Sequence, residues 1–424
     1  MKSVITCDTE GIIKTINTGT KQLFGYDKDE LIDKKRVSLF SPGEIVLQNV
    51  AGWLNQAKAE GEYIGKTIFV SKEGRIINAK IKITPLYADG KDNPMTGYCG
   101  VTEEINEEVT VPIKASTKFV KALAITRMPF VSAVLMPGLI GGAFVSTYMS
   151  QSITDFQFNT FFFVLCIIGL ILLQLGSNVF NDYFDVKDGT DDANSSYFTQ
   201  YSGGSRAIEL GLISLSGTKK LGIALLLTSF LIGLYITFNI GLTVIYIGLV
   251  GLFLGFFYTA PPLRLVARKG LGELSILLAF GPVVTMGVAY VLTQQISLGS
   301  FLVGIPAGLL TVNILLINQF PDAESDATTG KNHLVVTFGK EKSVWIYFTI
   351  LSASFITNIW LWNQHFDSNI AFLVVSLGSY AVGLEIWLKI RRDYEKRELV
   401  KQNVKTIALS ALTGLATALS IWFG

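Results

Sequence analysis

Two acidic motifs carry the residue types that are most suited to chemistry. Each has an asparagine followed by two aspartates at the spacing of helical turns, and their members are Asn178, Asp182, Asp185, Asn318, Asp322 and Asp326. Residues at i, i+4 and i+7 or i+8 lie on one face of a helix. Clustered carboxylates repel one another and are costly to desolvate, so they imply a compensating cation. Because all of the donors are oxygens, the motifs predict Mg²⁺ held by carboxylates and bridged to a diphosphate.

The two motifs also repeat each other. Residues 178–182 read NVFND and residues 318–322 read NQFPD, and both follow a long apolar run. An acidic segment at the end of an apolar helix can be a solvated loop, and this is our interpretation of Asp188 and Asp192, which fall outside the first stripe. For two stripes in corresponding positions, we prefer a ligand site between two related halves of the chain.

Cationic and aromatic residues lie near the motifs. Lys187 follows the first, Lys331 follows the second, and Arg206 stands in the segment SGGSRAIELG. Such side chains can neutralise a departing diphosphate, although the charge bias of membrane proteins explains Lys187 and Lys331 equally well. Tyr201 and Tyr258 present aromatic faces that can stabilise a cation, and ordinary packing is the alternative for each.

Hydrophobic residues make up 50% of the 424-residue chain, but they are unevenly distributed. Residues 1–110 mix polar and apolar types, and a linker is expected at 111–127. Residues 128–424 are dominated by apolar runs near the ~20 residues that span a bilayer. Nine windows are expected to form the helices of an all-α polytopic membrane domain: 129–149, 158–180, 220–238, 240–258, 272–293, 298–317, 344–362, 368–388 and 404–423.

Charge between the windows predicts the orientation of these helices. The five segments on one side carry 21 lysine and arginine residues, and the four loops on the other side carry none. By the positive-inside rule, the N-terminal domain and both acidic motifs are cytoplasmic, and the chain ends outside. We expect a multi-pass protein of the plasma or inner membrane, with two four-helix halves and a ninth helix added to them.

Other features argue against several classes of site. The net charge is +2 and no basic block resembles a nucleic-acid-binding arm, so no nucleic-acid partner is expected. Cys7, Cys99 and Cys166 lack CxxC spacing, which argues against a zinc site or a disulfide framework. The N-terminus has no apolar segment of a cleaved signal. Of the two histidines, His333 and His365, the second is expected on the outer side, and a histidine base is not expected.

The two motifs resemble the signatures of the UbiA superfamily of intramembrane aromatic prenyltransferases. The first signature begins NDxxD, here Asn181 to Asp185, and the second is DxxxD, here Asp322 to Asp326. The resemblance covers about residues 115–424. It implies a helical bundle whose central cavity opens sideways to lipid and receives a long isoprenyl tail.

Further stretches resemble the 1,4-dihydroxy-2-naphthoate polyprenyltransferase branch of that superfamily. They are NDYFDVKDGTD in the first motif, SGGSRAIELGLIS after it, and YTAPPLRLVARKGLGE at residues 258–273. The position four residues after Asp185 is Gly189 instead of a third acid, and Asp191 takes its place. One departure follows the second motif, where the branch tends to read GKRTL and this chain reads GKNHL at 330–334, without the arginine at 332.

The residue pattern and the resemblance together define the expected site. The expected metal ligands are Asp182, Asp185, Asp191, Asp322 and Asp326. The expected catalytic residues are Asp182, Asp185, Asp322, Asp326 and Arg206. The expected substrate-binding residues are Asn178, Asn181, Lys187, Tyr201, Tyr258, Asn318 and Lys331.

The resemblance implies magnesium-assisted loss of pyrophosphate from a polyprenyl diphosphate and attack of an aromatic ring on the allylic cation. The expected acceptor is 1,4-dihydroxy-2-naphthoate in menaquinone biosynthesis, with 4-hydroxybenzoate, a lipid-glycerol or haem as alternatives. A cation carrier gated by the N-terminal domain is an alternative of another class. Transport would favour acids near the bilayer centre, whereas both motifs are expected at cytoplasmic helix ends.

The N-terminal segment CDTEGIIKTINTGTKQLFGYDKDELIDKK, residues 7–35, resembles the opening of a PAS domain. The later segments 66–87 and 95–105 alternate like antiparallel strands with glycine turns, so a small α/β domain is expected. The segment has no histidine and no cysteine in a flavin-adduct motif, which disfavours histidine-ligated haem and flavin photochemistry. Small-ligand sensing or pairing into a dimer is the expected role, and an inert domain is the alternative.

Overall fold

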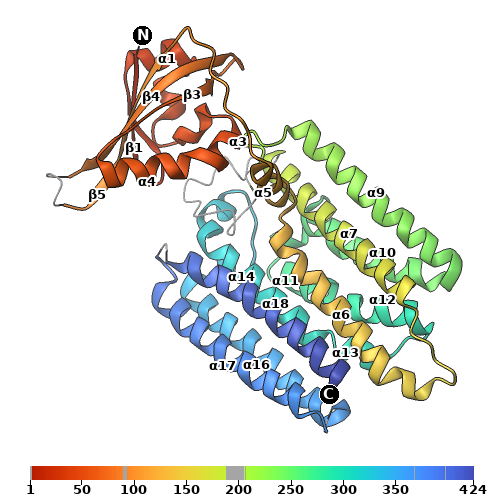
Figure 1. Ribbon diagram of the computed structural model, residues 1–424. Coiled ribbons are helices and arrows are strands. Elements are labelled where there is room, and N and C mark those ends of the chain that lie inside the picture. The colour runs from red at the N-terminus through yellow and green to blue at the C-terminus, as the bar shows by residue number, and fades with distance from the viewer. Residues whose placement is uncertain (1, 89–92, 188–204, 206, 367, 397) are drawn as a thin grey trace. The chain divides into compact units, whose positions relative to one another are not determined.

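The alternating segments of the first hundred residues form one antiparallel sheet in the computed structural model (Figure 1). The structure describes residues 2–88, 93–187, 205, 207–366, 368–396 and 398–424. The strands are β1 (Lys2–Asp8), β2 (Ile13–Ile16), β3 (Tyr63–Val70), β4 (Ile76–Tyr87) and β5 (Met95–Glu104), in the order β2-β1-β5-β4-β3. Gly74, with a left-handed backbone, lies in the turn between β3 and β4. The predicted α/β domain is confirmed.

Short helices pack against this sheet and close its core. They are α1 (Thr18–Phe24), α2 (Lys28–Leu31), α3 (Gly43–Ile45) and α4 (Ala51–Glu60), with single turns η1 (Val37–Phe40) and η2 (Val46–Val50). The Phe24 ring lies 4.3 Å from that of Phe40 and meets Phe69 edge-on at 5.8 Å, so the core joins α1 to β3. Burial raises the pKa of the Cys7 thiol to about 11. All three cysteines are free.

The described residues group into two compact units, which are Met1–Ile125 with Arg206–Leu215 and Thr126–Ser205 with Ser216–Gly424. The segment after the first acidic motif therefore groups with the N-terminal unit, although its place in the chain is inside the expected membrane domain. Two of its side chains, Ala207 and Leu212, are each 3% exposed. A methyl group added at Gly43 of α3 would lie 2.2 Å from the Leu210 carbonyl oxygen, so α3 contacts this segment.

The expected linker contains a helix, α5 (Ala115–Thr126). Its start is held by Gln48, whose side-chain oxygen accepts hydrogen bonds from Lys114 N at 2.9 Å and Thr117 Oγ1 at 2.8 Å. One turn later, Lys121 pairs with Glu44 of α3 at 2.6 Å. The N-terminal unit thus contacts α5 at its start and one turn later, while side chains such as Phe119 remain exposed.

Each of the nine apolar windows contains helix, as predicted. The helices are α6 (Ser132–Thr147), α7 (Thr160–Lys187), α9 (Leu215–Ile240), α10 (Thr243–Thr259), α11 (Leu271–Ala279), α12 (Pro282–Thr293), α13 (Leu298–Leu302), α14 (Ile305–Thr328), α16 (Lys340–His365), α17 (Ile370–Asp393) and α18 (Leu399–Phe423), with turns η3 (Met128–Val131), η4 (Met149–Ser152) and η5 (Leu265–Ala267). Among the described residues, eight helical segments are long and apolar enough to cross a membrane, and α10 is a shorter apolar helix. The chain is a multi-pass membrane protein.

Two of the predicted helices are interrupted. The window 272–293 is divided into α11 and α12 at Gly281, and the window 298–317 into α13 and α14 at Gly304. The backbones meet at these breaks, because a methyl group added at Gly281 would lie 2.4 Å from the Gly304 carbonyl oxygen. One added at Gly308 would lie 2.4 Å from a carbonyl oxygen of α11. Glycine allows this approach, and the hydropathy of the windows does not reveal it.

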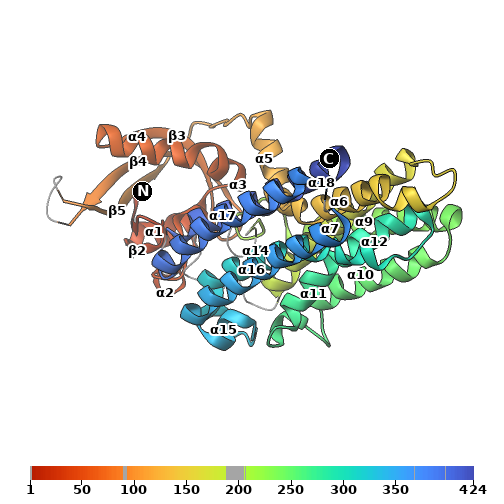
Figure 2. The ribbon, with the colours of Figure 1, turned by 90° about the horizontal axis from the view of Figure 1, so that it is seen from below.

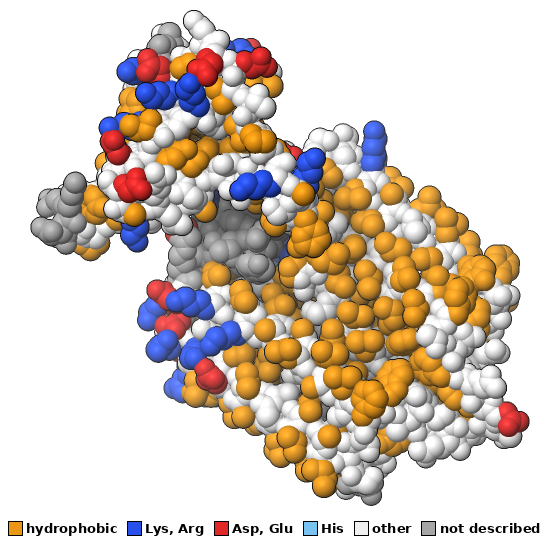
Figure 3. Space-filling model, viewed as in Figure 1, with side chains coloured by type: hydrophobic (Ala, Val, Ile, Leu, Met, Phe, Trp, Pro, Cys, Tyr) orange, Lys and Arg blue, Asp and Glu red, His pale blue; other side chains and the backbone are white. Residues whose placement is uncertain are grey.

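The ninth predicted helix is integral to the bundle. α18 packs against α6, α14 and α17, and α14 packs in addition against α11 and α16 (Figures 1 and 2). Because α14 carries the second acidic motif, these neighbours fix the position of that motif. The helical unit presents mostly hydrophobic side chains on the face seen in Figure 3, as contact with lipid requires.

The close contact at Gly308 makes a stability prediction. Replacing Gly308 by alanine should lower the melting temperature in detergent, because the added methyl group meets backbone atoms that cannot move independently; overpacking typically costs about 1–3 kcal/mol. Gly378→Ala on α17 is the matched control, since its methyl group meets nothing within 4 Å and alanine favours helix. Equal melting temperatures for the two variants would show that the contact has no role in stability.

Candidate active site

Both acidic motifs lie within helices rather than in loops that follow them. α7 continues to Lys187 and α14 to Thr328, so the residues of each motif lie along successive turns, as their spacing predicts. The carboxylates are buried: Asp182 is 5% exposed, and Asp185 and Asp326 are each 8% exposed. Buried carboxylates need counter-charges or hydrogen bonds, so their partners define the site.

A cavity of about 810 Å³ lies against both motifs. The predicted site residues that line it are Asn178, Asn181, Asp185, Tyr258, Asn318, Asp322, Asp326 and Lys331. Most of the remaining wall is apolar and comes from α7, α9, α10 and α12, with side chains such as Leu173, Phe230 and Val288. The cavity therefore combines a group of charged and amide side chains with a long hydrophobic surface, which suits an amphiphilic ligand.

Lys331 joins the two motifs. Its Nζ lies 2.8 Å from Asp185 Oδ1 on α7 and 3.6 Å from Asp326 Oδ1 on α14. Burial lowers the pKa of this ammonium group, but the carboxylates of Asp185 and Asp326 outweigh burial and raise the pKa overall. Lys331 is therefore charged, and it compensates for one acid of each motif. The predicted convergence of the two motifs on one place is thus seen in the structure.

Asp182 has a different set of partners. Its Oδ1 accepts a hydrogen bond from Ser205 N at 3.2 Å and lies 3.7 Å from Arg127 Nη1. Its Oδ2 is buried and has no hydrogen-bond partner among the described residues. Asp182 is not among the described residues that line the cavity, but its neighbour Arg127 is.

Arg127 is a site residue that sequence reasoning missed. It lines the cavity, and its side chain is 15% exposed and lies over the ring of Phe130 at 5.0 Å. Its backbone has a φ of 52°, a sparsely populated conformation for a residue other than glycine. Asn178 Nδ2 donates to the neighbouring Thr126 carbonyl at 3.2 Å, which fixes the strained segment against α7. In the sequence, Arg127 is marked only as a cation just before the first apolar window, and such a cation indicates the orientation of the helix.

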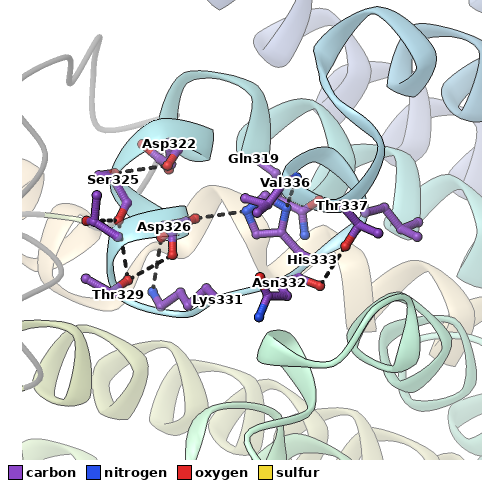
Figure 4. A network of polar contacts seen from close by, with 12 residues as sticks. Gln319, Asp322, Ser325, Asp326, Thr329, Lys331, Asn332, His333, Val336 and Thr337 are labelled. Carbon is purple, nitrogen blue, oxygen red and sulfur yellow. Dashed lines mark hydrogen bonds and ion pairs between the residues drawn. The ribbon is translucent and has the colours of Figure 1, made fainter.

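The second motif belongs to a wider network (Figure 4). His333 Nε2 lies 3.1 Å from Asp326 Oδ2, and Leu334 N donates to Glu273 Oε1 at 3.1 Å. Gln319 Nε2 donates to the same Glu273 oxygen at 3.0 Å. Glu273 therefore anchors the first residue of α15 (Leu334–Phe338), and Gln319 and His333 both line the cavity.

The remaining predicted residues differ in their placement. Asn181 donates to Asp185 Oδ2 at 3.0 Å, and Asn318 accepts from Asn403 of α18 at 2.8 Å, so both amides are oriented by partners. Lys187 is exposed at the end of α7 and is not among the described residues that line the cavity. The predicted residues Asp191, Tyr201 and Arg206 lie outside the part of the chain that the structure describes.

The acids of the site are oxygen donors of the kind that Mg²⁺ prefers. Among the described residues, no three His, Cys, Asp or Glu side chains lie close enough to form a metal site on their own. The carboxylates of Asp185 and Asp326 instead face the ammonium of Lys331. The buried Asp182 Oδ2 has no hydrogen-bond partner among the described residues. The donor set is of the kind that suits a hard cation such as Mg²⁺.

Comparisons with known proteins match this arrangement. Residues 134–411 match the model of the UbiA prenyltransferase family, and residues 2–107 match a PAS domain model. The 1,4-dihydroxy-2-naphthoate octaprenyltransferase of Bacillus subtilis is 29% identical over 242 residues, which are 56% of this chain and 71% of that protein. The enzyme of the same name from Haemophilus influenzae is 30% identical over 228 residues, which are 52% of this chain and 71% of that protein.

A solved structure is similar in fold. The UbiA homolog from Archaeoglobus fulgidus bound to GPP and Mg²⁺ is 18% identical and superposes with a TM-score of 0.50. It covers 70% of this chain and 99% of its own. The family model spans more than half of the sequence, including both acidic motifs. This protein therefore belongs to the UbiA prenyltransferase family, as a membrane enzyme that carries a PAS domain at its N-terminus.

Proposed function

We propose that this enzyme transfers a polyprenyl group from a polyprenyl diphosphate to 1,4-dihydroxy-2-naphthoate, a step of menaquinone biosynthesis. The observation that carries this proposal is the amphiphilic cavity, in which acids from α7 and α14 meet at Lys331 beside a long apolar wall. A polyprenyl diphosphate has a matching division between a charged head and a hydrocarbon tail. The names of the relatives from Bacillus subtilis and Haemophilus influenzae support the choice of acceptor.

Mg²⁺ is the cofactor that we propose for this site. Asp182, Asp185, Asp322 and Asp326 are the described residues that would hold it, and Asp191 is a further predicted ligand. The orphaned Asp182 Oδ2 and the oxygen-only donor set fit a hard cation. When bound, Mg²⁺ supplies positive charge that stabilises the leaving diphosphate. The solved relative with GPP and Mg²⁺ supports this assignment.

The side chains of the chain itself supply the remaining functions. Lys331 and Arg127 line the cavity as cations, and we assign them to the diphosphate oxygens that gain charge as the C–O bond to the prenyl group breaks. The electron pair leaves with the diphosphate, and the acceptor ring supplies the pair for the new C–C bond. Tyr258 lines the cavity and offers an aromatic face to the allylic cation. The apolar wall excludes water, which would otherwise capture that cation.

The acceptor distinguishes this proposal from its alternatives. For 1,4-dihydroxy-2-naphthoate, loss of carbon dioxide accompanies addition of the prenyl group. Transfer to 4-hydroxybenzoate, a lipid-glycerol or haem would use the same diphosphate chemistry with another nucleophile. We further propose that the protein lies in the plasma or inner membrane with its N-terminal domain in the cytoplasm, as the distribution of lysine and arginine favours.

We propose that the PAS domain regulates the enzyme through the two places where the chain passes between the units. Ile125 ends the N-terminal unit, and the next residues, Thr126 and Arg127, contact Asn178 and Asp182. These junction residues therefore adjoin two of the predicted site residues. A ligand or partner copy that shifts α5 would act on this contact first.

The second junction also ends at Asp182. Ser205 donates to Asp182, and the segment that follows packs within the N-terminal unit against Gly43. α3 thus contacts both this segment and, through Glu44 and Lys121, helix α5. A sensed small ligand or pairing into a dimer could act on the acids by moving α3.

The transfer reaction is tested with purified full-length protein in detergent. Radiolabelled octaprenyl diphosphate, Mg²⁺ and a panel of aromatic acceptors should give labelled prenylated naphthoquinol, and chelation of Mg²⁺ should abolish the product. Asp185→Asn and Asp322→Asn should each lower turnover by about 100-fold or more, as loss of a transition-state charge contact does. Glu324→Gln is the matched control, because Glu324 lies on the same helix with its side chain 86% exposed. Product only with another acceptor would overturn the menaquinone assignment.

Arg127→Gln should reduce turnover by about 10²-fold, because a cation that faces the departing diphosphate is lost. It should also lower the melting temperature, because the buried Asp182 loses a charged partner. The measurement is kcat and KM for the polyprenyl diphosphate. Arg392→Gln serves as the control, since that side chain is 71% exposed and pairs with Asp393 outside the cavity. If both variants turn over at the native rate, Arg127 is not part of the machinery.

Gly43→Ala tests the proposed link to the PAS domain. The added methyl group must displace the chain at Leu210, and we expect turnover to fall about tenfold, which corresponds to the weakening of one hydrogen bond to a charged group. Gly52→Ala in the same unit is the control, because its methyl group meets nothing within 4 Å. Native turnover in both variants would favour an inert N-terminal domain.

A further inference from the structure

His333 occupies the position where the sequence departs from the related branch, and its ring makes two hydrogen bonds. The residue is 1% exposed. Its Nδ1 accepts a hydrogen bond from Val336 N at 3.3 Å, and its Nε2 lies 3.1 Å from Asp326 Oδ2. Since Nδ1 uses its lone pair to accept, the ring proton is on Nε2, which therefore donates to Asp326. Figure 4 shows the ring between the backbone of α15 and the carboxylate.

The two oxygens of Asp326 have different partners. Oδ2 accepts from His333, and Oδ1 lies 3.6 Å from the ammonium of Lys331, which also binds Asp185. The imidazole thus holds the carboxylate in an orientation that directs Oδ1 toward the first motif. Without a donor on Oδ2, the carboxylate could rotate about its side-chain bonds and exchange its two oxygens.

The imidazole is itself fixed on both sides. It caps the N-terminus of α15 through Nδ1, and the next residue, Leu334, donates its backbone N–H to Glu273 Oε1. Lys331 N donates to the Asp326 carbonyl at 2.9 Å, which closes the turn between motif and histidine. An imidazole has only two rotatable side-chain bonds, so a ring held at both nitrogens has little freedom. It is a rigid support for the acid.

We propose that His333 is a positioning residue of the active site, which sets the oxygen of Asp326 that is presented to the metal–diphosphate head of the substrate. The inference rests on the proposed function, because it takes Asp326 as a ligand of that head group. It does not make His333 a base, since Nε2 donates and Nδ1 is occupied by α15. Groups that orient a metal ligand typically change metal affinity or activity by 10–100-fold when they are removed.

The alternative is that His333 serves only as a helix cap, and two conservative variants separate the roles. In His333→Asn, the side-chain oxygen can accept from Val336 N as Nδ1 does, but the amide is too short to reach Asp326. In His333→Gln, the amide nitrogen can reach Asp326 as Nε2 does, but the cap is lost. A positioning role predicts that the Gln variant retains function better than the Asn variant, and a capping role predicts the reverse order.

The first measurement needs no turnover. Melting of the full-length protein is followed during titration with magnesium pyrophosphate, which tests binding of the head group alone. For His333→Asn, the concentration that gives half of the stabilising shift should rise by about tenfold or more, and for His333→Gln by less than about threefold. His365→Asn is the control, because the other histidine contacts Phe144 and Phe366 on the opposite part of the bundle and lines no part of the described cavity. A native midpoint for His333→Asn with a weakened His333→Gln would overturn the proposal.

The second measurement is turnover with a polyprenyl diphosphate. His333→Asn should raise the Mg²⁺ concentration needed for half-maximal rate, with a smaller effect on the KM for the acceptor. If the native protein binds magnesium pyrophosphate and the variants follow the predicted order, but no acceptor is prenylated, the proposed function fails while the role of His333 stands. If transfer occurs and the order of the two variants is reversed, the role of His333 fails while the proposed function stands.

Discussion

The structure of the site depends on the compensation of buried negative charge. Asp185 and Asp326 are almost fully buried within a membrane unit, where an unpaired carboxylate would be too costly to keep ionised. Lys331 faces both acids, and it brings the ends of α7 and α14 together although the two helices are far apart in the chain. The helices carry the acids, but the ammonium group between them determines how close the acids can lie.

Apart from Asn181 of α7, which donates to Asp185, the groups that partner the acids come from the segments between helices. Arg127 stands between α5 and the turn before α6, Ser205 precedes the return to the N-terminal unit, and Lys331 and His333 follow α14. This division has a physical reason. A helix can direct one stripe of side chains toward the cavity, whereas an irregular backbone can also offer its own N–H groups and can turn a long cation back toward the acids.

Periodic features of the fold could be predicted from the sequence. The helical spacing of Asn178, Asp182 and Asp185 is a local property, and so are the lengths of the apolar windows and the alternation that gives β3 and β4. The interruptions at Gly281 and Gly304 could not be predicted from the sequence. Glycine does not make a window less apolar, and the backbone contact that it permits here is between two different windows.

The partners of the acids were harder to predict for the same reason. Arg127 and His333 have no periodicity that marks them, and each becomes part of the site only through a contact with a distant helix or a later turn. The departure at 330–334 was visible as a change from an expected pattern. Its consequence could not be predicted, because the contact of the His333 ring with Asp326 depends on how the turn after α14 folds back.

Charge balance also constrains how ligands can enter the proposed site. In the present arrangement, Lys331 already offsets the carboxylates that face it. A cation arriving alone would be placed beside an ammonium group, and a diphosphate arriving alone would be placed beside carboxylates, so each would meet repulsion from one part of the site. When the cation and the diphosphate arrive together, the cation can face the carboxylates while the phosphate oxygens face Lys331 and Arg127. The arrangement therefore favours binding of the metal and the diphosphate as a pair. Because His333 fixes the orientation of Asp326 in advance, the site needs less rearrangement when such a paired ligand binds.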